Sequence, residues 1–309
     1  MTCCNMAKEN DGEDNRMLLS EMNKRKDYLV CIDSDGCLLD NMELKHKECF
    51  CPAVVNVWDL QSVSRYAREV WEFVNLYSRT RGANRFPALV RALELIYARP
   101  EVQERHIRQW DIVALKKWSE ETDNFSESAL ASFIERQGDA AAPDLQNALR
   151  WSREVNSNVR HIVRNIGPFP GVQETLAALH EHADVVVVSS TPQEALIREL
   201  DHCGILNGFD AVAGQESGTK AICIRTAMQK GYAPDHVLKV GDAPGDHQAA
   251  LDNGCLFYPI IPGLERESWR RLREEAAGQF IAGTYQGEPM AKRLEQFYTV
   301  LGDKPGWEA

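Results

Sequence analysis

The stretch YLVCIDSDGCLLDN, residues 28–41, places two carboxylates directly after a short apolar run. The run at 28–32 has the length and composition of a buried strand. Asp33 and Asp35 follow it, one residue apart, and Gly36 comes next. Charged side chains at the end of a buried strand are costly unless something pairs with them. The pattern therefore indicates a functional site at the carboxyl end of the first strand.

A second apolar run, DVVVVSS at 184–190, is typical of a strand that is buried on both faces. After residue 165 the predicted strands and helices alternate, which indicates right-handed crossovers and a parallel sheet. We expect helices at 172–182, 192–203, 219–231 and 245–253. We expect the remaining strands at 184–188, 209–213, 236–240 and 255–260, with two further helices after 265.

Between the first two strands, apolar residues recur at helical spacing in segments such as 59–78, 86–97 and 126–137. Caps or turns at Asp59, Phe86-Pro87 and Ser126 would start these helices. The fold class predicted is α/β, a doubly wound parallel sheet interrupted by an all-helical insert. The predicted division is a mobile lead-in at 1–27, an α/β core at 28–45 and 165–309, and the helical unit at 46–164.

Charge and cysteine content narrow the class of partner. The net charge of −11 disfavours general binding of nucleic acid or of anionic membranes, but a local cation still permits a small anionic substrate. The apolar runs are too short to span a bilayer. Nine scattered cysteines without a Cys-x-x-Cys pair favour reduced thiols and a cytoplasmic location. The oligomeric state is left open.

Polar residues follow each predicted strand, and in a doubly wound sheet these positions meet at one edge. Lys220 opens the helix after the third strand, and Ser189, Ser190 and Thr191 follow the second. Asp242 and Asp246 follow the fourth, in the sequence GDAPGD. Carboxylates gathered this closely repel one another unless protons or a cation neutralise them. Hard oxygen ligands suit Mg²⁺, which also binds phosphate.

In that order, the segments DSDGCLLD, VVVVSST, Lys220 and GDAPGD resemble the four motifs of the haloacid dehalogenase-like hydrolase superfamily, and in particular its phosphoglycolate phosphatase-type phosphatases. The resemblance covers roughly 28–45 and 165–261. It implies a Mg²⁺-dependent phosphatase that acts on a small phosphorylated metabolite through an aspartyl-phosphate. It also implies that the helical insert is a cap, with NIGPFPGV at 165–172 as its return hinge.

The resemblance assigns roles to individual residues. Asp33 would be the nucleophile and a metal ligand. Asp35 would be the general acid/base, and its backbone carbonyl would also contact the metal. Ser189 would hold a phosphoryl oxygen, and Lys220 would stabilise Asp33 and the phosphoryl group. Asp242 would be a metal ligand, and Asp246 would support the metal directly or through water. An aspartate at position 35 favours phosphate esters over carbon–halogen or carbon–phosphorus bonds.

Substrate contacts are expected beside Ser190 and Thr191 and from the helical unit. Its segment 75–86 gathers arginines around a glycine, which suits an anionic or polyhydroxyl substrate; a solvated turn is the alternative. Lys45 and His46 lie where the core enters the insert, and a solvated linker is equally consistent with them. The expected substrate-binding set is Ser190, Thr191, Arg79, Arg81, Asn84, Arg85, Lys45 and His46.

Other sites fit the sequence less well. A calcium-binding loop that begins at Asp33 would need oxygen ligands at the positions of Cys37 and Leu44. The segment GQESGTKA differs from the pattern of a phosphate-binding loop at Thr219 and Ala221. Two other functions stay open. One is a phosphotransferase or phosphomutase of the same superfamily, and the other is a non-catalytic binding protein.

Overall fold

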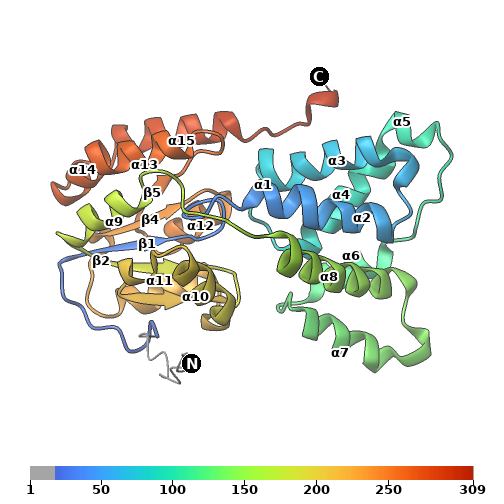
Figure 1. Cartoon of the computed structure of the whole chain (residues 1–309), viewed down its shortest axis with the longest axis horizontal. Helices are drawn as coiled ribbons and strands as arrows, with labels where there is room; N and C mark the ends of the chain where they lie inside the picture. Colours follow the sequence, from blue (N-terminus) through green and yellow to red (C-terminus); the bar gives the residue numbers. More distant parts are fainter. Residues whose placement is uncertain (1–17, 309) are drawn as a thin grey trace, which may run out of the picture.

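The computed structural model describes residues 18–308, and its centre is a five-stranded parallel sheet. The strand order is β3-β2-β1-β4-β5, so the first strand lies in the middle (Figure 1). In register, Cys31 of β1 lies opposite Val186 and Lys239. The strands are β1 Tyr28–Ile32, β2 Ala183–Val188, β3 Ala211–Ala213, β4 Val237–Gly241 and β5 Leu256–Pro259.

Helices cover both faces of the sheet, because successive side chains of each buried strand point to opposite sides. In β1, Val30 and Ile32 join one apolar cluster, whereas Leu29 and Cys31 join another. The first cluster packs α9 Val172–His180, α10 Gln193–His202, α13 Glu265–Arg271 and α14 Ala277–Ile281. The second packs α11 Lys220–Met228, α12 Pro244–Leu251 and α15 Glu288–Val300. The predicted fold class is confirmed.

The segment between β1 and α9 forms a helical unit beside the sheet, with an apolar core of its own (Figure 1). Four of its tryptophans, Trp58, Trp71, Trp118 and Trp151, are buried in it. Its α-helices are α1 Met42–Leu44, α2 Cys51–Val57, α3 Ser64–Glu72, α4 Arg85–Ala98, α5 Pro100–Gln103, α6 Val113–Glu121, α7 Glu127–Gln137 and α8 Pro143–Ile162. Short π-helical segments at Lys45–Phe50 and Phe73–Tyr77 extend α1 and α3.

The starts of these helices agree with the sequence only in part. Ser126 caps α7, and its side chain accepts a hydrogen bond from the amide of Ala129, as predicted. Asp59 caps nothing, since helical structure begins at Gln61 after Leu60. Helix α4 begins at Arg85 rather than after Phe86-Pro87, because the side chain of Asn84 accepts from the amide of Phe86.

Part of the predicted mobile lead-in at 1–27 contacts the core. Residues 1–17 of the predicted mobile segment lie outside the described residues. Within 18–27, Met22 is buried against the second apolar cluster. The amides of Arg25 and Lys26 both donate to the carboxylate of Asp184 at 2.9 Å. A buried carboxylate needs such donors, so this part of the lead-in is fixed to the core.

The carboxyl-terminal segment crosses from the core to the helical unit (Figure 1). The amide of Gly302 donates to the carbonyl of Tyr77 at 3.0 Å. Asp303 forms a 2.6 Å ion pair with Arg79, and the ring of Trp307 packs edge-on against Phe73 at 5.6 Å. The segment thereby supports the start of the loop at 78–84.

Candidate active site

The loop after β1 turns sharply at Gly36, which adopts a φ of +72°. A Cβ atom there would lie 2.5 Å from a carboxylate oxygen of Asp242 and 2.7 Å from the guanidinium of Arg81. Only glycine tolerates both the backbone conformation and this close approach. Before this turn, Asp33 lies at the sheet edge, and Asp35 lies beside the entrance to the helical unit.

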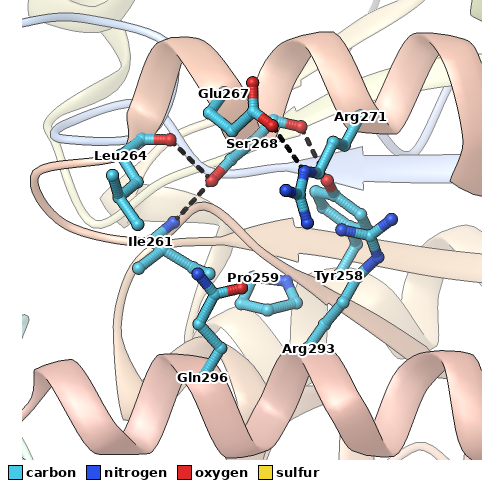
Figure 2. Close-up of a pocket in the computed structure, with 9 residues that line it drawn as sticks. All are labelled: Tyr258, Pro259, Ile261, Leu264, Glu267, Ser268, Arg271, Arg293 and Gln296. Atoms are coloured by element: carbon cyan, nitrogen blue, oxygen red, sulfur yellow. Dashed lines mark hydrogen bonds and ion pairs between the residues drawn. The ribbon is translucent and has the colours of Figure 1, made fainter.

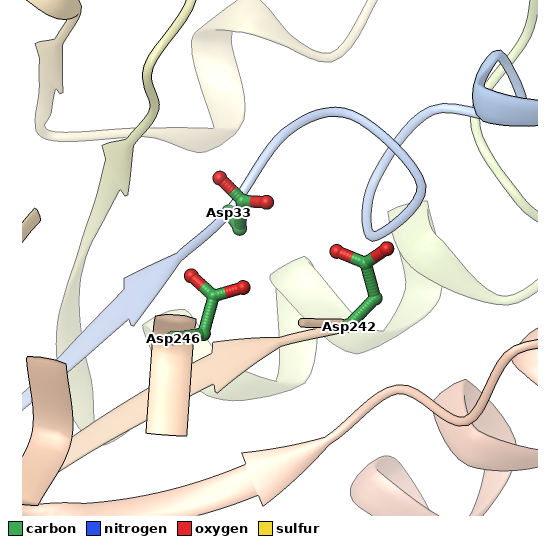
Figure 3. Close-up of side chains that lie close together, drawn as sticks. All are labelled: Asp33, Asp242 and Asp246. Atoms are coloured by element: carbon green, nitrogen blue, oxygen red, sulfur yellow. The ribbon is translucent and has the colours of Figure 1, made fainter. Parts of the chain in front are cut away.

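Three carboxylates meet at this edge, one from each of three segments (Figure 3). Asp33 follows β1, Asp242 follows β4, and Asp246 lies in the first turn of α12. All three side chains are buried, and one oxygen of each lies within 4.8 Å of the others. Among the described residues, this is the one cluster of acidic, histidine or cysteine side chains compact enough for a metal ion.

Two lysines neutralise part of this charge. The ammonium of Lys220 lies 2.9 Å from Oδ1 of Asp33 and 2.8 Å from Oδ1 of Asp246. The ammonium of Lys239, on β4, lies 3.0 Å from the same oxygen of Asp246. Asp246 Oδ2 accepts from the amide of Ala243 at 3.3 Å. Asp246 is therefore held mainly by protein cations.

The pKa values of the three carboxyl groups differ because each group has different charged partners. Burial, reinforced by the charge of Asp246, raises the pKa of Asp33 to about 7. Burial also raises the pKa of Asp242, against the opposing effect of Arg81. For Asp246 burial acts in the same upward direction, but Lys220 and Lys239 outweigh it and hold the pKa below its ordinary value. Additional positive charge beside Asp33 would favour its ionised form.

Arg81 reaches the cluster from the helical unit. Its Nη2 and Nε lie 2.6 and 2.8 Å from Oδ2 of Asp242, and its Nη1 donates to the carbonyl of Leu76 at 3.0 Å. The next residue, Gly82, packs so tightly that a Cβ would come within 2.5 Å of Ala243. The loop 78–84 thus joins the helical unit to the core through a buried ion pair.

Asp35 stands apart from the three carboxylates and pairs with the entrance to the helical unit. Both its oxygens accept from Lys45 Nζ, at 2.9 and 3.0 Å, and Asn41 and Thr191 also donate to it. Burial raises the pKa of Asp35, but Lys45 outweighs burial and keeps it below its ordinary value. Lys45 also lies 3.7 Å from Glu199 of α10.

The hydroxyl groups after β2 differ in their exposure. Ser189 is buried, its Oγ lies 2.6 Å from Oγ of Ser34, and it accepts from the amide of Thr191 at 3.0 Å. Ser190 is exposed. The hydroxyl of Thr191 reaches Asp35 at 3.4 Å. Thr191 thus contacts Asp35, and Ser189 contacts Ser34, which lies between the two aspartates in the sequence.

The other polar residues singled out in the helical unit serve local structure. Arg79 is exposed and pairs with Asp303, and Asn84 caps α4. Arg85 donates to Ser152 and Asn156 at 3.2 and 2.8 Å, and burial lowers its pKa. A substrate contact from these three stays a prediction, whereas Arg81 and Lys45 already touch carboxylates of the site.

His46 lies next to this region as a neutral ring. Its Nδ1 accepts from the indole of Trp71 at 3.2 Å, and its ring stacks on Phe50 at 4.8 Å. Burial, helped by nearby Arg81, lowers the pKa of His46 from 6.5 to about 3. The folded protein therefore resists protonation of this ring.

This pKa predicts a loss of stability in mild acid. Between pH 6.5 and pH 3 the unfolded chain binds a proton at His46 that the folded chain does not, so the free energy of unfolding falls as pH falls. By pH 5 the loss is about 2 kcal/mol. We expect His46→Gln, which keeps an acceptor for Trp71, to avoid this loss. In this variant the free energy of unfolding in urea should fall by about 2 kcal/mol less by pH 5 than it does in the wild type. His182→Gln, at an exposed histidine, is the control and should leave the slope unchanged. Equal slopes in both variants and the wild type would rule out the assigned pKa.

Sequence reasoning missed several members of the site. Lys239 was visible as a lysine inside the apolar run HVLKVG, a position where a charge needs a partner. Asn41, which donates to Asp35, stands at the end of the opening stretch. Ser34 and Glu199 carry no local pattern that marks them, and only the fold brings them to the aspartates.

One small cavity and two cysteines away from this edge offer no comparable site. A small cavity of about 10 Å³ between β5, α13 and α15 is lined by side chains that bond one another, such as Ser268 with Ile261 and Arg271 with Glu267 (Figure 2). Cys49 and Cys51 are buried, and burial raises the pKa of both thiols. They join no metal-like cluster among the described residues. None of the helices described between residues 18 and 308 has the length and apolar content for a membrane crossing.

Comparison with known proteins adds a family match. The family model of haloacid dehalogenase-like hydrolases matches residues 110–259, which include Ser189, Lys220, Asp242 and Asp246. Two curated proteins, small ribosomal subunit protein uS2 of Caenorhabditis elegans and of Caenorhabditis briggsae, are each 32% identical over 99 residues. Those alignments span 31% of this chain and only 33% of the length of either relative.

Several solved structures are similar to the chain. A protein of Lactobacillus delbrueckii subsp. bulgaricus assigned as a phosphoglycolate phosphatase is 15% identical, with 85% of this chain and 100% of that chain covered and a TM-score of 0.49. CbbY of Rhodobacter sphaeroides, in complex with phosphate, is 14% identical, with 76% and 87% covered and a TM-score of 0.40.

Proposed function

We propose that the chain is a haloacid dehalogenase-like hydrolase, which the family-model match over residues 110–259 supports, and that it is a Mg²⁺-dependent phosphatase that hydrolyses a small phosphate monoester through an aspartyl-phosphate on Asp33. The observation that carries this proposal is the pairing of Asp33 with Lys220 at 2.9 Å beside two further buried carboxylates. The buried carboxylate of Asp33 lies beside an ammonium and beside oxygen ligands for a metal ion. It is therefore suited to attack a phosphoryl group that the ammonium and the metal ion hold in place.

The donor set fits a hard divalent cation. Asp33 and Asp242 offer carboxylate oxygens within 4.8 Å of each other, and both are buried with raised pKa values, as expected of carboxyls that lack sufficient positive charge. We propose that these two residues and the backbone carbonyl of Asp35 hold Mg²⁺. Asp246 supports the set indirectly, since its Oδ1 already accepts a hydrogen bond from Lys220 and forms an ion pair with Lys239. When bound, Mg²⁺ supplies charge that offsets the phosphoryl oxygens.

In the first step, an oxygen of Asp33 attacks phosphorus, and the bond between phosphorus and the ester oxygen breaks. The departing oxygen takes a proton from Asp35. In the second step, Asp35 accepts a proton from water as the water oxygen attacks phosphorus, and the bond from phosphorus to Asp33 breaks. Lys220 lies against Asp33 throughout and offsets the negative charge of the transferring group.

The ion pair between Lys45 and Asp35 favours the second step, in which Asp35 acts as a base, more than the first, in which it acts as an acid. Its ion pair keeps Asp35 ionised, as a general base must be. For the first step, Asp35 needs a proton and hence a weaker contact with Lys45. Lys45 belongs to the segment that enters the helical unit, so we propose that movement of this unit, acting as a cap over 46–164, loosens the pair when substrate binds.

Ser189 and Thr191 are proposed to donate to phosphoryl oxygens, with Ser190 as a further contact at the rim. Arg81 would border the substrate from the cap loop. The seven cysteines of the described part are free thiols, which supports a cytoplasmic location as part of this proposal.

The test is a panel of phosphate monoesters with Mg²⁺, in which free phosphate and phosphate transferred to a second sugar are measured together. Free phosphate in excess supports the phosphatase, and transferred phosphate in excess would favour the phosphotransferase. Mg²⁺ binding without turnover on any ester would favour a non-catalytic binding protein. Treatment with a chelator should abolish activity, and added Mg²⁺ should restore it.

A further inference from the structure

Lys239 is a charged residue in the interior of the protein that the proposed reaction does not use. It lies in the middle of β4, with Cys31 and Phe257 opposite it on the two neighbouring strands, and its side chain is fully buried. Its neighbours Leu238 and Val240 pack into the first apolar cluster. Lys239 therefore points to the other face of the sheet, toward α11 and α12.

The surroundings of Lys239 on that face offer little compensation for a positive charge. Three buried thiols, Cys31, Cys223 and Cys255, lie near enough for its charge to affect them. Burial raises the pKa of each thiol, so these groups stay neutral and cannot act as counter-ions. An isolated ammonium in such a place would be strongly destabilising.

Asp246 is the one carboxylate within 4.0 Å of the Lys239 ammonium among the described residues, at 3.0 Å. The contact has ion-pair distance without a well-aligned hydrogen bond, so its contribution is one of charge. On its other side, Asp246 holds Lys220, which in turn contacts Asp33. A Cβ at Gly241 would come within 2.3 Å of Asp246, so the end of β4 also presses the carboxylate into place.

We propose that Lys239 is a positioning residue: it neutralises Asp246 from behind, so that the charge of Lys220 remains directed at Asp33 and the phosphoryl group. The row Asp33, Lys220, Asp246 and Lys239 contains two carboxylates and two ammonium groups and is balanced. Without Lys239, two carboxylates share one ammonium, and Asp246 draws Lys220 away from Asp33. The role rests on the proposed function, and Lys239 is too deeply buried to touch substrate.

The proposal predicts opposite changes in two quantities. In Lys239→Met, which preserves the length of the side chain, kcat should fall by about 10- to 100-fold with little change in KM. The cluster also becomes more negative, so Mg²⁺ alone, titrated by calorimetry, should bind about threefold or more tightly. A general loss of structure would instead weaken Mg²⁺ binding along with activity.

A double-mutant cycle with Asp246→Asn tests whether Lys239 acts through Asp246. If it does, Lys239→Met added to Asp246→Asn should change kcat and the Mg²⁺ dissociation constant by less than about twofold. The urea midpoints should also show coupling, because the double variant removes both charges and should be more stable than additivity predicts. This second readout needs no activity, so it separates a failure of this inference from a failure of the proposed function. Independent effects on all three quantities would overturn the role assigned to Lys239.

Discussion

Asp33→Asn should abolish phosphate release, with a loss on the order of 10⁴-fold or more in kcat, while the protein stays folded. An amide has no anionic oxygen to attack phosphorus. Folding should survive because the substitution removes a carboxylate whose charge is opposed by burial and by Asp246. Lys220 keeps its 2.8 Å contact with Asp246. The measurement is phosphate released from 4-nitrophenyl phosphate with Mg²⁺, alongside thermal unfolding.

Asp40→Asn is the matched control for this variant. Asp40 lies in the same loop after β1, but its side chain is exposed. Its replacement should leave kcat within about twofold, as expected of a surface change away from the site. Activity that survives in Asp33→Asn, or that falls equally in both variants, would remove Asp33 from the role of nucleophile.

Arg81→Met should destabilise the protein by about 3 kcal/mol when a chelator is present. Arg81 and Asp242 form a buried ion pair with side chains only 4% and 2% exposed, and removing one partner leaves a buried charge uncompensated. Mg²⁺ can neutralise Asp242 in its place. We therefore expect Mg²⁺ to raise the Tm of this variant more than that of the wild type, because binding to the folded state stabilises it.

The neighbouring Arg79 provides the control. Arg79→Met removes an arginine from the same loop whose partner, Asp303, is also exposed. Exposed ion pairs contribute little, so the change in free energy of unfolding should be within about 1 kcal/mol, with an ordinary response to Mg²⁺. If Mg²⁺ stabilised Arg81→Met no more than Arg79→Met, Arg81 and the metal would not share Asp242.

The sheet and the strand-end residues followed from sequence because both depend on local patterns. Buried strands leave continuous apolar runs, and parallel connection brings their carboxyl ends together. For that reason Asp33, Asp242 and Lys220 could be placed at one edge from the chain alone. The side chain of Asp35 pairs with Lys45, a contact that no local pattern in the sequence predicts.

Contacts between segments far apart in the chain could not be predicted from the sequence. Arg81 and Asp242 are 161 residues apart, and no spacing rule relates a loop of the helical unit to the end of β4. Arg79, two residues earlier, has the same side chain yet points to the carboxyl-terminal segment. The start of α4 was misplaced for a local reason, since the cap is the side chain of Asn84 and the proline lies inside the first turn.

The central claim is covalent catalysis by Asp33, and rapid mixing of Asp35→Asn with 4-nitrophenyl phosphate tests it most directly. Nitrophenolate leaves without a proton, so the first step should proceed, whereas the second lacks its base. The account predicts a burst of nitrophenolate close to one per active site, with a phosphate adduct on Asp33 in the quenched protein by mass spectrometry. Asp33→Asn should show neither. Turnover of Asp35→Asn without a burst, or an adduct on another residue, would contradict the account.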